Sequence, residues 1–348
     1  MRKTLLSRFV RAVAYQANGT LVVVDKPEPR AGPGQAVVAV ERCGICGSDL
    51  HLRRSGMLAP GAVMGHEFAG TVVAAGEGQG VDDASGLVGL RVGVLPFRRC
   101  GTCARCIEGR SALCVEGMAH GLGLGGLDGA FAEYVSVSSR SCFPLPPGMT
   151  PEHGALVEPY AVALHGVRRS RAAPGSVVGV IGAGPIGLMT IAALRAAGVD
   201  AIVVAERSDT RAELAAALGA SAVAADAHQL SSAIGEDLDV VFECAGVPET
   251  PQIALELVRP GGQVVLVGVT NPDEPLTMVS FLWIIKEVDV AGSFAYDDAD
   301  YADAVTAVAS SAVDPALVVS DVRAFEDANA SFDELTLPGG PVKLLLAP

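Results

Sequence analysis

The chain contains the sequence Ser176-Val-Val-Gly-Val-Ile-Gly-Ala-Gly-Pro-Ile-Gly187. The apolar run from Ser176 to Ile181 predicts a buried strand, and the apolar spacing from Ile186 to Ala197 predicts a helix. Glycines between a strand and a helix at this spacing are typical of a dinucleotide site: they allow the tight turn, the approach of a pyrophosphate and the packing of helix on strand. The helix N-terminus would face the phosphates. The candidate contacts are Gly182, Gly184, Pro185, Ile186 and Gly187.

The next predicted strand, 201–205, ends at Glu206. A carboxylate at this point would accept hydrogen bonds from ribose hydroxyls and repel a 2′-phosphate, which favours NAD over NADP. Arg207 and Arg211 follow, and an arginine beside the ribose can accommodate a phosphate. They are equally well interpreted as the exposed start of a helix.

The alternation of strand and helix continues beyond this unit. Helices are expected at 210–218 and 248–257, and strands at 240–243, 263–267 and 288–292. This order predicts a parallel, doubly wound sheet, so the fold class is α/β.

The N-terminal part reads differently, as short β-strands separated by turn signals, which predicts a β-barrel or sandwich. The expected strands are 12–15, 21–24, 36–40, 71–74 and 91–95. After Ser293, a helical pattern at 301–310, a second at 315–319 and a strand at 342–346 are too short for a domain. We expect this tail to return to the N-terminal barrel.

Four of the eight cysteines fall within one segment, in a lobe near 98–115. Four thiolates at such spacings can close a tetrahedral shell around a structural zinc ion. Two disulfides are the weaker alternative, because no secretory signal precedes the chain. The four residues are Cys100, Cys103, Cys106 and Cys114.

A second candidate metal site begins in Cys43-Gly-Ile-Cys-Gly-Ser-Asp-Leu-His51 and continues in Gly65-His-Glu67. A thiolate and an imidazole suit zinc, and the remaining polar groups can orient ligands or move protons. Taken alone, the first stretch is better interpreted as a glycine-rich turn with incidental polar residues, and the rest of the chain decides for the metal site.

Charge and composition exclude some classes of partner. The net charge of −14 argues against binding to nucleic acid or to an anionic membrane surface, because their phosphates would be repelled. We find no secretory signal and no uninterrupted apolar span, and expect a cytoplasmic protein.

With these motifs in place, the chain resembles the zinc-dependent medium-chain alcohol dehydrogenases, particularly the polyol, sorbitol and threonine dehydrogenase branch. The likeness runs from Ala12 onward and includes both cysteine motifs, Gly65-His66-Glu67, Val157-Glu158-Pro159 and the glycine-rich turn. It implies a GroES-like β-barrel catalytic domain, 1–156 with 294–348, interrupted by a Rossmann NAD-binding domain, 157–293.

The resemblance also implies roles for single residues. Cys46 and His66 would bind a catalytic zinc ion, with Glu158 or Glu67 as the third ligand. Ordinary alcohol dehydrogenases have a cysteine at the position of Glu158, and this departure points to the polyol branch. Asp49 would accept a hydrogen bond from the ring of His66.

Further roles concern the proton and the cofactor. Ser48 would take the substrate proton and pass it toward His51. Backbone groups of Val267 and Gly268 would lie beside the nicotinamide, and Lys343 near the pyrophosphate, although a solvated lysine is nearly as good an interpretation.

Together these implications predict a dehydrogenase with two zinc ions per chain that transfers hydride between a secondary alcohol or polyol, or the matching ketone, and NAD. NADP is the less favoured cofactor. The alternative is a non-catalytic, zinc-stabilised NAD-binding redox sensor or binding protein. The family commonly forms homodimers or homotetramers through the cofactor domain, and the apolar stretch 281–285 could serve there.

Overall fold

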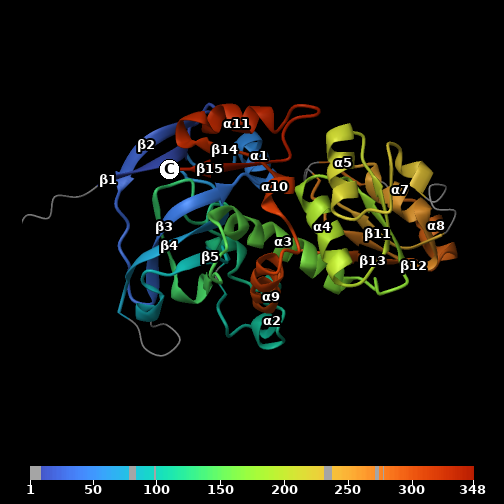
Figure 1. Ribbon diagram of the computed structural model, residues 1–348, viewed down its shortest axis with the longest axis horizontal. Helices are drawn as coiled ribbons and strands as arrows, with labels where there is room; N and C mark the ends of the chain where they lie inside the picture. The colour runs from blue at the N-terminus through green and yellow to red at the C-terminus, as the bar shows by residue number, and fades with distance from the viewer. Residues whose placement is uncertain (1–8, 78–83, 98, 231–236, 271–273, 277) are drawn as a thin grey trace, which may run out of the picture. The chain divides into compact units, whose positions relative to one another are not determined.

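The computed structural model describes residues 9–77, 84–97, 99–230, 237–270, 274–276 and 278–348. By internal contacts the chain divides into two units: Met1–Glu158 with Val319–Pro348, and Pro159–Val318 (Figure 1). The chain therefore leaves the first unit once and returns to it near its C-terminus.

The first unit is built on a mixed sheet with strand order β14-β15-β3-β4-β5-β7, and β6 also pairs with β3. The strands are β3 (Gln35–Gly44), β4 (Glu67–Ala75), β5 (Arg91–Val94), β6 (Tyr134–Ser138), β7 (Cys142–Pro144), β14 (Val319–Ala324) and β15 (Lys343–Ala347). A separate hairpin joins β1 (Phe9–Tyr15) and β2 (Leu21–Pro27). The five strands expected from the sequence are confirmed, most of them longer than predicted.

The register of the central strands brings distant segments together. Gly44, at the end of β3, lies opposite Glu67 of β4 and opposite Leu345 of β15. The residues that follow Gly44, those that precede β4 and the start of β15 therefore meet at one end of the sheet. The core beneath this sheet contains Phe68, Phe131 and Phe332.

The second unit holds a six-stranded parallel sheet, with strand order β10-β9-β8-β11-β12-β13. The strands are β8 (Val177–Ile181), β9 (Ala201–Ala205), β10 (Ala222–Ala224), β11 (Leu238–Glu243), β12 (Val258–Leu266) and β13 (Asp289–Gly292). All five residues of β8 are buried, as expected for a strand covered on both faces. The predicted doubly wound sheet is confirmed, and its strand order reverses between β8 and β11.

Three helices lie where the sequence predicted them: α4 (Pro185–Ala196), α5 (Asp209–Ala217) and α7 (Thr250–Leu257). A fourth, α8 (Ser280–Ile285), covers the apolar stretch 281–285, for which no helix was predicted. The longer helix α3 (Pro151–Arg169) leads from the first unit into the second.

The second boundary between the units lies later than the expected residue 294. Helix α9 (Asp298–Ala309) and helix α10 (Pro315–Val318) belong to the second unit. Asp300 of α9 accepts hydrogen bonds from His165 and from Arg168 of α3, each at 2.6 Å. The chain joins the first unit from Val319, where β14 pairs in parallel with β15.

No helix among the described residues is long and apolar enough to cross a membrane.

Candidate active site

The four cysteines of the lobe come together as predicted. Their sulfur atoms all lie within 4.8 Å of one another. Cys100 Sγ lies 3.9 Å from Cys106 Sγ and 3.6 Å from Cys114 Sγ. Four sulfurs at about 2.3 Å from a central zinc would be about 3.8 Å apart, so the cluster matches a tetrahedral zinc shell.

Backbone donors and burial act on the thiols of this lobe. The N–H of Cys103 donates to Cys100 Sγ, and the N–H of Cys100 donates to Cys114 Sγ, both at 3.3 Å. The N–H groups of Thr102 and Cys103 lower the pKa of Cys100 to about 6, whereas desolvation raises the pKa of Cys106 to about 12. Four thiolates this close repel one another, so a bound cation is what allows all of them to ionise.

Cys46, His66 and Glu67 form the second cluster, with ligand atoms within 4.8 Å of one another. Cys46 is the N-cap of helix α1 (Gly47–Ser55), two residues after the end of β3, and His66 directly precedes β4. The pairing of Gly44 with Glu67 explains why these segments meet. His66 and Glu67 are buried and Cys46 is half-buried, so the cluster has one accessible side.

Asp49 is completely buried between the two ligand segments. One carboxylate oxygen accepts from the N–H of Cys46 at 2.9 Å, and the other lies 3.5 Å from His66 Nδ1. Burial is the largest single influence and alone would lower the pKa of His66, but the charges and hydrogen bonds of Asp49 and Cys46 together outweigh it and raise that pKa well above its usual value. Asp49 thus lies on the Nδ1 side of the ring and leaves Nε2 facing Ser48. Its orienting role stays a prediction.

The predicted proton relay lies on one helix. Ser48 Oγ is 3.3 Å from His66 Nε2, which places the hydroxyl beside the cluster. His51 is half-buried and lies three residues later on α1, so both side chains project from neighbouring positions of one helix face.

Lys343 has contacts that the sequence did not reveal. It is 1% exposed, and its Nζ donates to the Ile45 carbonyl at 3.0 Å and forms an ion pair with Glu67. Burial alone would lower the pKa of Lys343, but the negative charges of Glu67 and Cys46 outweigh burial and raise it. A charged lysine inside an apolar strand was the available signal. Its predicted role at the pyrophosphate stays a prediction.

Gly44 makes this arrangement possible. A Cβ atom at this position would lie 2.3 Å from Glu67 Oε2 and 2.9 Å from Lys343 Cε. The second predicted carboxylate, Glu158 of α3, is also buried but lies outside the group of ligand atoms formed by Cys46, His66 and Glu67.

The glycine-rich turn has the geometry of a phosphate-binding loop. Gly182 has φ +92°, a conformation that side chains rarely allow. A Cβ atom on Gly184 would meet nothing within 4 Å, which leaves room for a ligand, whereas one on Gly187 would lie 1.9 Å from the carbonyl oxygen of Gly182. Helix α4 begins at Pro185 without a side-chain cap, so its N-terminal N–H groups can bind an anion.

Glu206 supports this turn directly. Its carboxylate accepts from the N–H of Ala183 at 2.8 Å and from the N–H of Ser208 at 2.9 Å. Arg207 is exposed, while the buried Nε of Arg211 has no hydrogen-bond partner among the described residues.

Glu243, at the end of β11, was missed by the sequence reasoning. It is 1% exposed and accepts from the N–H groups of Ala245 and Gly246, at 2.9 and 2.8 Å. Its own carbonyl accepts from the N–H groups of Val267 and Gly268, at 2.9 and 2.8 Å. Desolvation raises the pKa of its carboxyl group. It ties together two loops at the carboxyl edge of the sheet, where ligands of such folds bind.

Comparison with known proteins supports the folds described for both the first and the second unit. The model of the alcohol dehydrogenase GroES-like domain matches residues 32–147, and the model of zinc-binding dehydrogenases matches residues 185–310. Sorbitol dehydrogenase from Bacillus subtilis is 34% identical over 91% of this chain and 91% of its own length. The chain belongs to the zinc-dependent medium-chain alcohol and polyol dehydrogenase family. The resemblance stated from the motifs is therefore confirmed, as is the GroES-like and Rossmann fold.

Other members of the family extend the likeness. The (R,R)-butanediol dehydrogenase of Bacillus subtilis is 37% identical over 78% of this chain and 80% of its own length. A protein of known structure from Sinorhizobium meliloti 1021, named as a zinc-binding dehydrogenase and bound to NADP, is 34% identical over 98% of this chain and all of its own, with a TM-score of 0.89. This chain is an oxidoreductase of secondary alcohols or polyols that uses zinc and a nicotinamide cofactor, and the non-catalytic alternative is not favoured.

Proposed function

We propose that this chain transfers hydride between a secondary alcohol or polyol and NAD, with Cys46 and His66 binding the catalytic zinc ion and the four lobe cysteines binding a second. The proposal rests on the thiol of Cys46 and the imidazole of His66, whose ligand atoms lie within 4.8 Å of each other although the residues come from different strand ends. Zinc in such a site, when bound, acts as a Lewis acid that lowers the pKa of an attached hydroxyl to about 7.

The chain's own residues supply the route for the proton. Ser48, beside His66, accepts the proton of the substrate hydroxyl, and His51 receives it at the more accessible part of α1. Asp49 keeps the imidazole of His66 in place.

For the third ligand, the structure favours Glu158 over Glu67. The carboxylate of Glu67 already has a buried counter-ion in Lys343, and drawing it away would leave that lysine unpaired in the protein interior. Zinc analysis of Glu158→Gln and Glu67→Gln separates the two. We expect Glu158→Gln to lose the catalytic zinc, and its full retention in that variant would reverse the assignment.

NAD is the proposed cofactor because the Glu206 carboxylate lies at the turn that would bind the pyrophosphate. The free Nε of Arg211 is the group that would interact with a 2′-phosphate once this carboxylate is gone. Glu206→Ala should raise kcat/KM with NADP and lower it with NAD. Unchanged use of NAD, together with no gain with NADP, would remove Glu206 from the ribose site.

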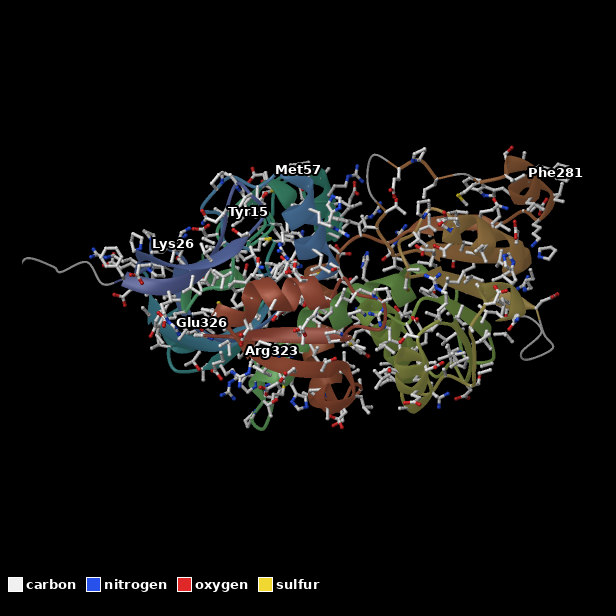
Figure 2. The ribbon with its side chains drawn as sticks, turned by 90° about the horizontal axis from the view of Figure 1, so that it is seen from above. Tyr15, Lys26, Met57, Phe281, Arg323 and Glu326 are labelled. Carbon is white, nitrogen blue, oxygen red and sulfur yellow. The ribbon has the colours of Figure 1, made fainter. Side chains whose placement is uncertain are left out.

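We also propose a homodimer formed through the second unit. Strand β13 is the last strand of its sheet, and an open edge is a template for pairing with another chain. Helix α8, nearby in sequence, exposes Phe281 by 65% and Ile284 by 73%. Figure 2 labels Phe281 on this helix. A second copy can cover both in a self-complementary, two-fold contact. Sedimentation analysis should show a dimer or a dimer of dimers, and a monomer at micromolar concentration would contradict this.

The substrate class is tested by following nicotinamide absorbance across alcohols, polyols and amino alcohols. We expect turnover with secondary alcohols or vicinal polyols. A fully zinc-loaded protein that turned over none of them would contradict the proposal. The cytoplasmic location stays a prediction from the sequence.

A further inference from the structure

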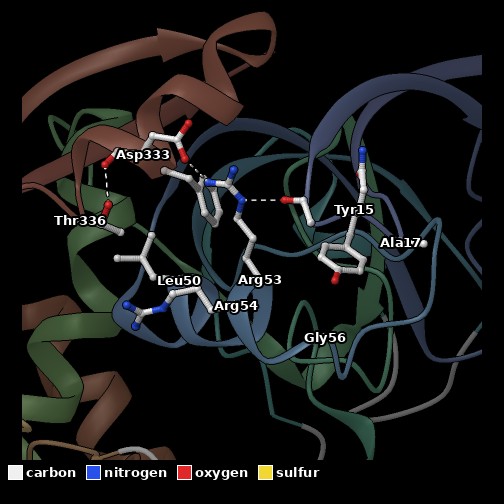
Figure 3. Close-up of a pocket in the computed structure, with 11 residues that line it drawn as sticks. Tyr15, Ala17, Leu50, Arg53, Arg54, Gly56, Asp333 and Thr336 are labelled. Atoms are coloured by element: carbon white, nitrogen blue, oxygen red, sulfur yellow. Dashed lines mark hydrogen bonds and ion pairs between the residues drawn. The ribbon is translucent and has the colours of Figure 1, made fainter.

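A pocket of about 510 Å³ lies in the first unit, between α1, the turn that joins β1 to β2, and helix α11 (Ala328–Glu334) with the residues after it (Figure 3). The volume is in the range of small-molecule sites. Helix α1 contributes Leu50, Arg53 and Arg54 to its wall. At 3.6 residues per turn these side chains lie about 140–240° around the helix from Ser48. The pocket therefore occupies the opposite face of α1 from the zinc cluster.

Arg53 is fully engaged in the wall of the pocket. Its Nε donates to the Gly19 carbonyl and its Nη1 to Asp333, both at 2.8 Å, and its guanidinium carbon lies 5.6 Å from the centre of the Phe332 ring (Figure 3). Arg53 thereby neutralises Asp333, the carboxylate that lines the pocket.

Arg54 is the cation left for a ligand. It is exposed, and its guanidinium makes no hydrogen bond or ion pair with the described residues. Because the charges of Arg53 and Asp333 cancel, Arg54 gives the pocket a net positive charge, although the net charge of the chain is −14. The C-terminus of α1 carries a partial negative charge from its free carbonyl groups, which repels an anion. The positive charges of Arg53 and Arg54 in the last turn offset this repulsion.

Other donors line the same pocket. The Oδ1 of Asn18 already accepts from the N–H and the hydroxyl of Thr20, at 3.1 and 2.7 Å, which leaves its amide NH₂ as the group that can reach a ligand. The hydroxyl of Tyr15 makes no hydrogen bond with the described part of the chain and lies on the other side of Arg53 from Leu50 and Arg54 (Figure 3). Donors without acceptors thus face the cavity from two sides.

We propose that this pocket is a second ligand site, separate from the active site, which binds a small polyhydroxylated compound through its carboxylate or phosphate group. Arg54 would bind the oxyanion, because hydrogen bonds between a cation and an anion are the strong ones. Asn18 and Tyr15 would donate to further oxygens, and Leu50 and Phe332 would contact the carbon skeleton.

Calorimetry on the zinc-loaded protein without nicotinamide cofactor tests the proposal. The probes are glucose 6-phosphate and gluconate, which distinguish the phosphate from the carboxylate, and sorbitol is the neutral control. We expect one of the two anions to bind once per chain, and sorbitol to bind at least tenfold more weakly. Failure of both anions to bind at millimolar concentration would overturn the site.

Matched variants locate the binding. Arg54→Ala should weaken it at least tenfold, and Tyr15→Phe about threefold, since it removes a neutral hydrogen bond without changing the ring. The control is Arg30→Ala, which removes another exposed arginine of the same unit that does not line the pocket and should change nothing. Equal affinity of wild type and Arg54→Ala would mean that the anion binds elsewhere, and would overturn the proposal.

Discussion

The lobe of four cysteines and the cluster around Cys46 are both suited to zinc, yet they are assembled in opposite ways. The lobe takes all its ligands from one short segment, and its four sulfurs form a closed shell. The other cluster combines the residues after β3, the start of β4 and the start of β15, and Lys343 donates to a carbonyl 298 residues away in sequence. A closed shell favours a structural role, whereas the open cluster depends on the whole sheet and can admit a substrate.

The largest expected effect comes from breaking the open cluster. Cys46→Ala removes the thiol of the cluster of Cys46, His66 and Glu67, so kcat/KM should fall about a thousandfold, which corresponds to about 4 kcal/mol of lost transition-state stabilisation. The melting temperature should change little, because Cys46 is half-buried and the sheet around it is intact. Steady-state kinetics and calorimetry check both parts. Wild-type turnover by chelator-treated Cys46→Ala would contradict a zinc mechanism.

Next in size is the loss of the buried ion pair behind that cluster. Lys343→Met keeps most of the unbranched side chain but leaves Glu67 buried without its cation, and should lower the free energy of unfolding by about 3–5 kcal/mol. Denaturant titration measures this.

The matched control is Lys26→Met, which breaks the exposed pair with Asp128 and should cost less than about 1 kcal/mol. If the two variants lost equal stability, the pair of Lys343 with Glu67 would not be the anchor that we describe.

A smaller loss is expected from the closed lobe. Cys103→Ser should release the structural zinc and with it the stabilisation that a tightly bound ligand provides, about 2–3 kcal/mol when the metal is present at about a hundredfold its dissociation constant. Turnover per folded molecule should stay close to wild type, as thermal unfolding and kinetics on the same sample can show. A loss of turnover as large as in Cys46→Ala would erase the distinction between the two sites.

The sequence predicted what is local. The cysteine lobe, the glycine-rich turn and the ends of β8 and β9 follow from short patterns, because each is organised by residues close together in the chain. The contacts of Lys343 could not be predicted, since they depend on the register of β15 against β3 and of β3 against β4.

The late return of the chain to the first unit was missed for a similar reason. Helix α9 is held by contacts between Asp300 and helix α3, more than a hundred residues earlier in the chain. Such long-range contacts cannot be predicted from a local sequence pattern. Glu243 likewise looked like the end of an apolar strand, although its carboxylate ties two loops together.

The zinc content of wild type and of Cys46→Ala, measured side by side by atomic emission after zinc has been supplied, tests the division between the two sites most directly. We expect two zinc ions per chain in the wild type and one in the variant, with the variant folded and about a thousandfold less active. Two ions retained in Cys46→Ala, or one in a well-folded wild type, would contradict it.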